Sequence, residues 1–248
     1  MKPHRGIGAL LGALLLGAVG MAQASLVGIL PTTAGGTNYQ AYYDSTTNLT
    51  WLANANMNGP MNWSAANTWA DTLSITGYNS SGQQVTVGGW TLPSITDTGT
   101  SGCNYGFSGT DCGFNVQTTS GSTVYSAMAS LYYDTLGNKG YCDTSGNCPQ
   151  AGWGLTNTSP FTNVQSYDYW SATEYAPGSP LAWYFGFKDG SQGLNFKTNI
   201  LYAWAVHSGD VGAPPTTGVP EPGVLGLMGM AIVGTAVALR RSTLRQSA

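Results

Sequence analysis

The chain has 248 residues, of which 42% are hydrophobic and only 8% are charged, and its formal net charge is −3. Between Ser25 and Gly218 there are three lysines, no arginine and ten Asp and Glu residues, which gives this part a charge of −7. A surface this poor in cations cannot neutralise a row of phosphates, so we expect no nucleic-acid partner.

The first 24 residues have the three-part layout of a secretory signal peptide. Lys2 and Arg5 precede an apolar run at 7–19, and residues 22–24 place small residues around a polar one. This layout predicts export, with cleavage between Ala24 and Ser25. A structural helix of the mature protein is the alternative, although the run is short for a membrane span.

Residues 25–211 are long enough to form one domain with its own core. Strand-like runs at 39–43 and 48–53, joined by the turn formers of 44–47, predict a hairpin. Ser64 is a suitable N-cap for a helix at 65–73, in which Trp69 and Leu73 share one face.

A second helix is predicted at 123–136. Its apolar residues recur at helical spacing, and Gly137 follows where a left-handed cap residue is favoured. These residues are Tyr125, Met128, Ala129, Tyr132 and Leu136, and we interpret them as a core face rather than a cofactor box. Before this helix, residues 88–93 predict a tight turn that enters a short extended segment.

Residues 138–160 have little periodicity and predict a long loop, of the kind that is functional or held in place by other contacts. The sheet that forms the core is expected at 167–207. Alternation at 182–187, followed by Asp189-Gly190 and a second alternating run at 194–196, predicts a hairpin with a two-residue turn. Segments 169–171 and 202–206 are expected to pair beside it.

The four cysteines do not have the C-x2-C spacing of structural zinc sites. Behind a signal peptide they predict two disulfides, because exported chains meet an oxidising compartment. Three pairings are open, of which we favour Cys103 with Cys112 and Cys142 with Cys148, since each closes its own glycine-bearing loop. A redox or copper-binding thiol pair is the functional alternative.

Residues suited to catalysis are scarce. The domain has one histidine, His207, and one glutamate, Glu174, so no Ser-His-Asp or two-histidine metal set can be assembled. We therefore predict that the protein is not an enzyme and that it has neither catalytic nor cofactor-binding residues. No metal ligand set can be named, although a structural calcium ion held by loop oxygens stays open. The eight tryptophans make stacking of sugar rings plausible, even if most are buried.

Several motifs together resemble the bacterial domain of unknown function 1566, the Lcl C-terminal domain. The motifs are those at 42–44, 49–52, 63–73, 89–93, 169–175 and 182–190. The resemblance implies an α+β, C-type-lectin-like fold with two helices packed on antiparallel β-hairpins, related to formylglycine-generating and sulfatase-modifying domains. The chain departs from the family at Thr91, where an arginine is usual, so a polar network anchored there is in doubt.

The C-terminal tail is similar to the PEP-CTERM sorting signal of exopolysaccharide-producing Gram-negative bacteria. A Pro- and Thr-rich linker at 212–218 leads to an apolar run at 223–239, expected as a transmembrane helix in a sorting segment at 219–248. The motif residues on either side of the run are Val219, Pro220, Glu221, Pro222, Arg240 and Arg241. A plain membrane anchor is the alternative.

These features predict a protein that is exported across the inner membrane, held briefly by its C-terminal helix and then passed to the cell surface or extracellular matrix. An exosortase-like membrane protease is the partner that the sorting signal implies. The expected role is glycan or protein binding, with exopolysaccharide or a surface protein as ligand. A purely structural matrix protein and an enzyme like the formylglycine-generating domains are the two alternatives.

Overall fold

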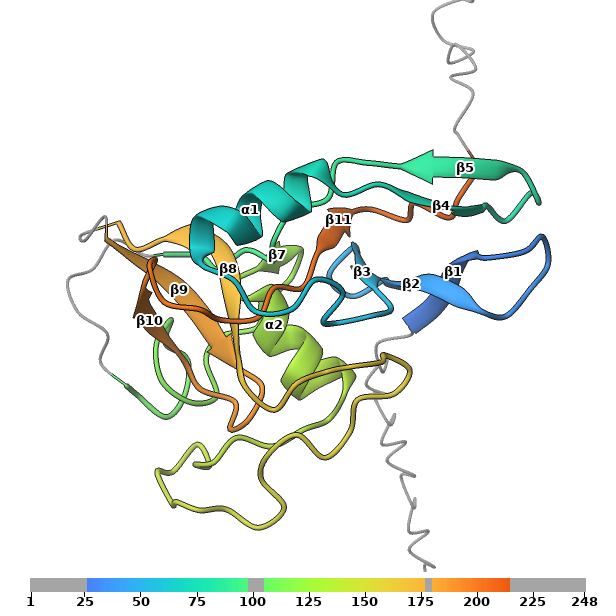
Figure 1. The fold of residues 1–248 in the computed structure, drawn as a ribbon. Helices are drawn as coiled ribbons and strands as arrows, with labels where there is room; N and C mark the ends of the chain where they lie inside the picture. The colour runs from blue at the N-terminus through green and yellow to red at the C-terminus, as the bar shows by residue number, and fades with distance from the viewer. Residues whose placement is uncertain (1–25, 98–104, 177–179, 215–248) are drawn as a thin grey trace, which may run out of the picture. The chain divides into compact units, whose positions relative to one another are not determined.

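The computed structural model describes residues 26–97, 105–176 and 180–214. The chain divides into one compact unit at Met1–Gly212 and a second at Ala213–Ala248. The predicted signal peptide, the sorting segment and most of the linker lie outside the described residues. What is described is a mixed fold, mostly antiparallel β-sheet with two short helical segments, which confirms the α+β class (Figure 1). No helix in these ranges is long and apolar enough to cross a membrane.

Four strands form the first sheet, in the order β1 (Leu26–Pro31), β2 (Tyr39–Asp44), β3 (Leu49–Leu52) and β11 (Val206–Ser208). β2 and β3 confirm the predicted hairpin, and in its turn the Asp44 carboxylate accepts the N–H of Thr46 at 2.9 Å. β1 is absent from the predicted elements. It passes so close to β2 that a Cβ on Gly28 would collide with the Tyr39 ring. This sheet therefore joins the two ends of the domain.

The second sheet has the order β10 (Gln192–Phe196), β9 (Leu181–Gly186) and β8 (Asp168–Glu174). It confirms the predicted hairpin and the pairing of 169–171 beside it. The two-residue turn is wrong, because the connection runs from 187 to 191. In it the N–H of Gly190, at φ +74°, donates to the carbonyl of Gly186 at 2.7 Å.

Segment 202–206 pairs differently from the prediction. Tyr202 forms a parallel bridge with Tyr169 of β8, but Val206 pairs with Trp51 of β3 in the other sheet. The segment therefore connects the two sheets instead of extending one of them.

Helix α1 (Trp63–Thr72) confirms the first predicted helix but begins earlier than expected. Its N-cap is Asn62, not Ser64, and the Asn62 side chain accepts the N–H of Ala65 at 2.9 Å. The residues that it buries completely are Ala66 and Ala70. The bulky Trp69 and Leu73 are only partly buried, so the largest apolar residues of this segment do not mark the buried face of the helix.

The second predicted helix begins at Ala127, four residues later than expected. Helix α2 (Ala127–Ala129) continues into the π-helical segment η1 (Ser130–Thr135), and Ser126 caps it by accepting the N–H of Ala129 at 3.3 Å. Thr123–Val124 instead form β7, which pairs with β6 (Thr119–Ser120). A good cap at Ser126 and the β-branched pair before it outweigh the helical spacing. Gly137 has φ +67°, as expected for the cap residue.

A further hairpin, β4 (Ile75–Tyr78) and β5 (Gln84–Val87), is absent from the predicted elements. Its turn contains Gly82 at φ +74°, and Asn79 accepts two backbone N–H groups across it. Segment 138–160 has no helix or named strand, which agrees with the loop prediction.

The core is aromatic. Five tryptophans are fully buried, as expected for most of them: Trp51, Trp90, Trp170, Trp183 and Trp204. Trp204 meets Trp51 and Phe161 edge to face, with ring centroids 5.1 and 4.9 Å apart. Its indole N–H donates to the carbonyl of Leu52 at 2.8 Å. The ring also lies 6.0 Å from the ring of Tyr169 in β8. Because it contacts Trp51 of the first sheet and Tyr169 of the second, Trp204 lies where the two sheets are held together.

Candidate functional site

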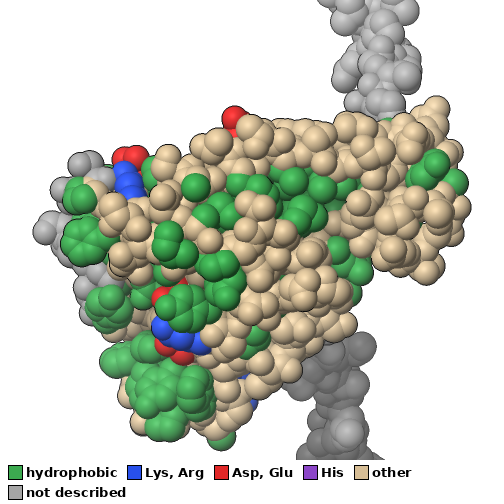
Figure 2. Space-filling model, in the orientation of Figure 1, with side chains coloured by type: hydrophobic (Ala, Val, Ile, Leu, Met, Phe, Trp, Pro, Cys, Tyr) green, Lys and Arg blue, Asp and Glu red, His purple; other side chains and the backbone are tan. Residues whose placement is uncertain are grey.

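Three aromatic side chains form the candidate site, which we call the aromatic patch: Tyr141, Trp153 and Tyr167. Trp153 is 42% exposed and Tyr167 is 48% exposed, in a domain that fully buries five of its eight tryptophans. Tyr141 meets Trp153 edge to face at 4.8 Å, and Tyr167 meets Tyr202 at 5.9 Å. Figure 2 shows hydrophobic side chains gathered beside basic and acidic ones on one face of the molecule.

A hollow of about 360 Å³ lies at the patch. It is lined by Tyr141, Trp153, Ser166, Lys188 and Asp189. The volume is near the lower end of the roughly 300–1,000 Å³ that small-ligand sites occupy. Aromatic walls with a few polar groups are the usual construction of such sites.

The turn between β9 and β10 supplies the charged groups of the hollow. The N–H of Tyr141 donates to the carbonyl of Asp189 at 2.7 Å, which holds the long loop against this turn. Within the turn, the Asp189 carboxylate accepts the N–H and the hydroxyl of Ser191 at 3.0 and 2.7 Å. The longer turn is therefore what places a lysine and a carboxylate beside the aromatic rings.

Lys188 and Asp168 form an ion pair, with Nζ and Oδ1 3.2 Å apart. Burial raises the pKa of Asp168 above its ordinary value, and the ammonium of Lys188 opposes this shift. Burial alone would lower the pKa of Lys188, but Asp168 and Asp189 together raise it. Lys188 therefore stays protonated at neutral pH, and its Nζ lies 5.8 Å from the centre of the Tyr167 ring.

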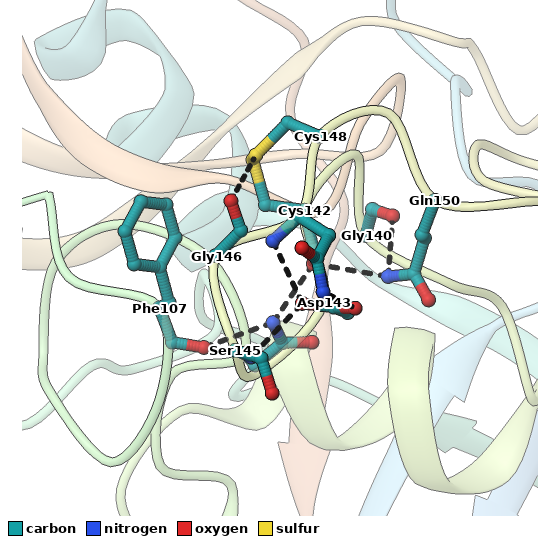
Figure 3. The surroundings of a disulfide bond; sticks show 10 residues. Phe107, Gly140, Cys142, Asp143, Ser145, Gly146, Cys148 and Gln150 are labelled. Carbon is teal, nitrogen blue, oxygen red and sulfur yellow. Dashed lines mark hydrogen bonds between the residues drawn. A yellow bond between two sulfur atoms is a disulfide. The ribbon is translucent and has the colours of Figure 1, made fainter.

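The Cys142–Cys148 disulfide is present, as predicted, and closes the loop that follows Tyr141. Within this loop Asp143 accepts the backbone N–H groups of Ser145 and Asn147, each at 2.9 Å. As Figure 3 shows, Gln150 reaches back to the carbonyls of Gly140 and Cys142, at 2.8 and 2.9 Å. These contacts fix the backbone on both sides of Tyr141.

A neighbouring loop supports the disulfide loop from outside. The Phe107 ring lies so close to Gly146 that a Cβ there would be 3.1 Å from two ring carbons, and the ring would have to shift slightly (Figure 3). Asn115 donates to the carbonyls of Phe107 and Cys142, both at 2.9 Å. Cys112 is buried in this second loop, whereas Cys103 lies outside the described residues, so their pairing stays a prediction.

The residues considered for catalysis lie on different elements. His207 is in β11, where its ring packs against Trp90 at 5.8 Å and its Nδ1 is 2.6 Å from the carbonyl of Ser208. Glu174 is at the end of β8 and pairs with Lys197 at 2.8 Å. Over 26–97, 105–176 and 180–214, no three His, Cys, Asp or Glu side chains are grouped in a way that could hold a metal ion. The signal cleavage residues and the sorting motif lie outside these ranges.

Two other hollows lack the exposed tryptophan and the lysine of the hollow at the aromatic patch. One, of about 490 Å³, lies beside β1 and the β4–β5 turn; its lining includes Tyr39, Tyr78 and Asp210, but neither tyrosine is exposed and no cation is among its described lining residues. The other, of about 210 Å³, adjoins Gln192. The amide of Gln192 already accepts from the Ser126 hydroxyl and donates to the carbonyl of Asp111, both at 2.6 Å. It therefore has little remaining hydrogen-bonding capacity for a ligand.

Trp153, Tyr141 and Lys188 are not among the site residues predicted from the sequence. A usable signal was present, because Trp153 stands between Gly152 and Gly154 in a polar loop, where no strand or helix requires a large ring. The comparisons with known proteins add nothing to these observations: no protein-family model matches the chain, and no curated protein or solved structure matches it.

Proposed function

We propose that this protein is exported to the cell surface or extracellular matrix and binds glycan through the aromatic patch. The observation that carries the proposal is the exposure of Trp153 and Tyr167 beside a hollow with polar groups. Aromatic faces pack on the C–H faces of sugar rings, while ammonium, carboxylate and hydroxyl groups bond to the sugar hydroxyls. Exposed rings forgo the free energy that burial of their apolar surface would provide, and a bound ligand that covers the rings would recover it.

The sorting segment supports export and surface delivery. The run at 223–239, at about 1.5 Å per residue, would span about 26 Å as a helix, just short of the roughly 30 Å hydrocarbon core. Arg240 and Arg241 would hold its end on the cytoplasmic side. Pro220 and Pro222 disfavour helix before them, so the motif would stay extended and accessible to an exosortase-like protease.

A binding role, rather than catalysis, fits the chemistry of the domain. His207 and Glu174 lie on different elements and each has its own partner, so neither is paired with a nucleophile. Asp168 and Asp189 lie beside an ammonium, not in a pair free to share a proton. The proposal therefore assigns no catalytic residue. No resident metal or cofactor is proposed either.

The C-type-lectin-like fold is the architecture that we propose for the domain, on the resemblance of its motifs to the domain of unknown function 1566. Three features support it: strands from the two ends of the domain lie in one sheet, a long loop region without named strands covers 138–160, and a disulfide closes a loop within that region. The aromatic patch is built partly from this loop region, a common location for binding residues on a rigid scaffold.

A glycan array with the exported protein tests the binding role. We expect the protein to bind at least one glycan and Trp153→Ala to lose that binding. Phe196→Ala is the matched control, because Phe196 is a 58% exposed aromatic residue outside the lining of the hollow. Absence of binding to any glycan would refute the binding role and favour a purely structural matrix protein.

Intact-mass analysis of the mature protein from its own host tests the sorting role. We expect the wild-type protein to have lost residues 1–24 and the sequence after the cleavage near Glu221, whereas Glu221→Ala retains its tail. Mature wild-type protein that still carries Arg240 and Arg241 would identify the tail as a plain membrane anchor.

A further inference from the structure

The hollow at the aromatic patch contains fixed charges of both signs. Lys188 contributes one ammonium, and Asp168 and Asp189 contribute two carboxylates close to it. Asp168 is 8% exposed, so its charge acts on the hollow from beneath, whereas the Lys188 side chain is 42% exposed. The sign and position of these groups restrict the charge of any ligand that can enter.

A ligand with a carboxylate or sulfate group would meet unfavourable electrostatics. Among the described residues that line the hollow, Lys188 is the only cation; it is already paired with Asp168 at 3.2 Å, and Asp189 adds a second carboxylate. Binding an anion to Lys188 would leave the buried Asp168 without its partner, and a buried charge without a partner is costly. The three lysines and ten acidic residues between Ser25 and Gly218 add a repulsive field around the site.

A ligand with an ammonium group is disfavoured for a different reason. Aromatic rings beside carboxylates can form a cage for a cation, but here Lys188 already holds that position, 5.8 Å from the centre of the Tyr167 ring. Its pKa is raised by Asp168 and Asp189, so it stays charged and repels a second cation. The hollow therefore supplies its own cation.

We infer that the aromatic patch selects an uncharged saccharide, a ring with hydroxyl groups that both donate and accept hydrogen bonds, over uronic-acid and amino-sugar polymers. This inference rests on the proposed glycan-binding function. The free N–H groups of the lysine ammonium donate to sugar hydroxyls, and the carboxylate and hydroxyl oxygens of Asp189 and Ser166 accept from them. Trp153 and Tyr141 provide the apolar surface for the ring.

Affinity electrophoresis of the full exported protein tests this selectivity, with three kinds of polysaccharide in the gel: dextran and galactomannan as uncharged polymers, alginate as an acidic one and chitosan as a cationic one. We expect retardation by an uncharged polymer and none by alginate or chitosan. Trp153→Ala should abolish the retardation, while Phe196→Ala, the exposed aromatic control, should not change it. Circular dichroism of each variant checks that it is folded.

The role of the Lys188 charge can be tested separately. Lys188→Met removes the ammonium and leaves the two carboxylates, so we expect chitosan binding to appear or to strengthen about threefold or more, the effect of one unit charge a few ångströms away in water. Stronger retardation by alginate or chitosan than by the uncharged polymers, lost in Trp153→Ala, would overturn the inference while the glycan-binding function stands. No retardation by any of the polymers would overturn the inference, and absence of binding on the glycan array as well would overturn the proposed function.

Discussion

Replacing both Cys142 and Cys148 with serine should destabilise the domain by an amount that follows from the length of the loop. The two cysteines are six residues apart, and the chain-entropy relation for a closed loop of this size gives about 2.2 kcal/mol. For a domain of this length, that loss corresponds to a fall in Tm of roughly 4–9 °C. Urea denaturation followed by tryptophan fluorescence measures both the loss and the slope of the transition.

The same variant should also weaken the candidate site, because Tyr141 directly precedes Cys142. The hydrogen bonds of Gln150 to Gly140 and Cys142 remain, so we expect weaker glycan binding rather than its complete loss. Thr144→Ala is the matched control, since it changes an exposed residue of the same loop and keeps the disulfide. In the wild-type protein, non-reducing peptide mapping should first link Cys142 to Cys148 and Cys103 to Cys112.

Two results would refute the reasoning. A loss of stability below about 0.5 kcal/mol would mean that hydrogen bonds alone close the loop, so that the disulfide adds no constraint to the unfolded chain. Unchanged glycan binding would mean that the disulfide loop does not position Tyr141.

Three further predictions concern the core, one glycine and one pKa. Trp204→Ala should cost about 3–5 kcal/mol in urea denaturation, because the ring is fully buried between the sheets, and Trp204→Phe should cost clearly less; equal losses would contradict the packing argument. Gly113→Ala should cost about 1–3 kcal/mol, since at φ +113° its Cβ would lie 2.6 Å from the Gly106 nitrogen, and a neutral result would count against this geometry. Lys188→Met should raise the pKa of Asp168 further, measured by ¹³C NMR of the carboxyl carbon. The pKa of Asp168 in the folded protein then lies further above its value in the unfolded chain, so the free energy of unfolding should fall more as pH rises from the unfolded through the folded pKa. An unchanged pKa of Asp168 would show that the ion pair does not act on it.

The sequence by itself predicted the elements whose signals are local. The hairpin at 39–53 and the β9–β10 hairpin follow from alternation interrupted by turn formers, and Gly137 follows a helical pattern at the position of the cap. The disulfide between Cys142 and Cys148 also depends on proximity along the chain. These features can be recognised from sequence because the interacting residues are few positions apart.

The boundaries of the helices depended on a choice between competing caps and between helix and strand, which the sequence pattern alone does not decide. Ser64 and Asn62 are both acceptable caps, and only Asn62 is positioned to accept the N–H of Ala65. At the second helix, pairing with β6 draws Val124 into a strand, so helical spacing from Tyr125 overstates the length of the helix.

The tertiary structure alone decided the candidate site. Tyr141 and Trp153 come from a loop without periodicity, Tyr167 directly precedes β8, and Lys188 comes from a turn whose length was mispredicted. The contacts that bring them together, such as Tyr141 to Asp189 and Lys188 to Asp168, join residues about 20 to 50 positions apart. Exposure of an aromatic ring is likewise a property of everything that packs around it. The glycines on either side of Trp153 hint at a loop, but only the structure shows that, of the eight tryptophans, it is the one with an exposed ring.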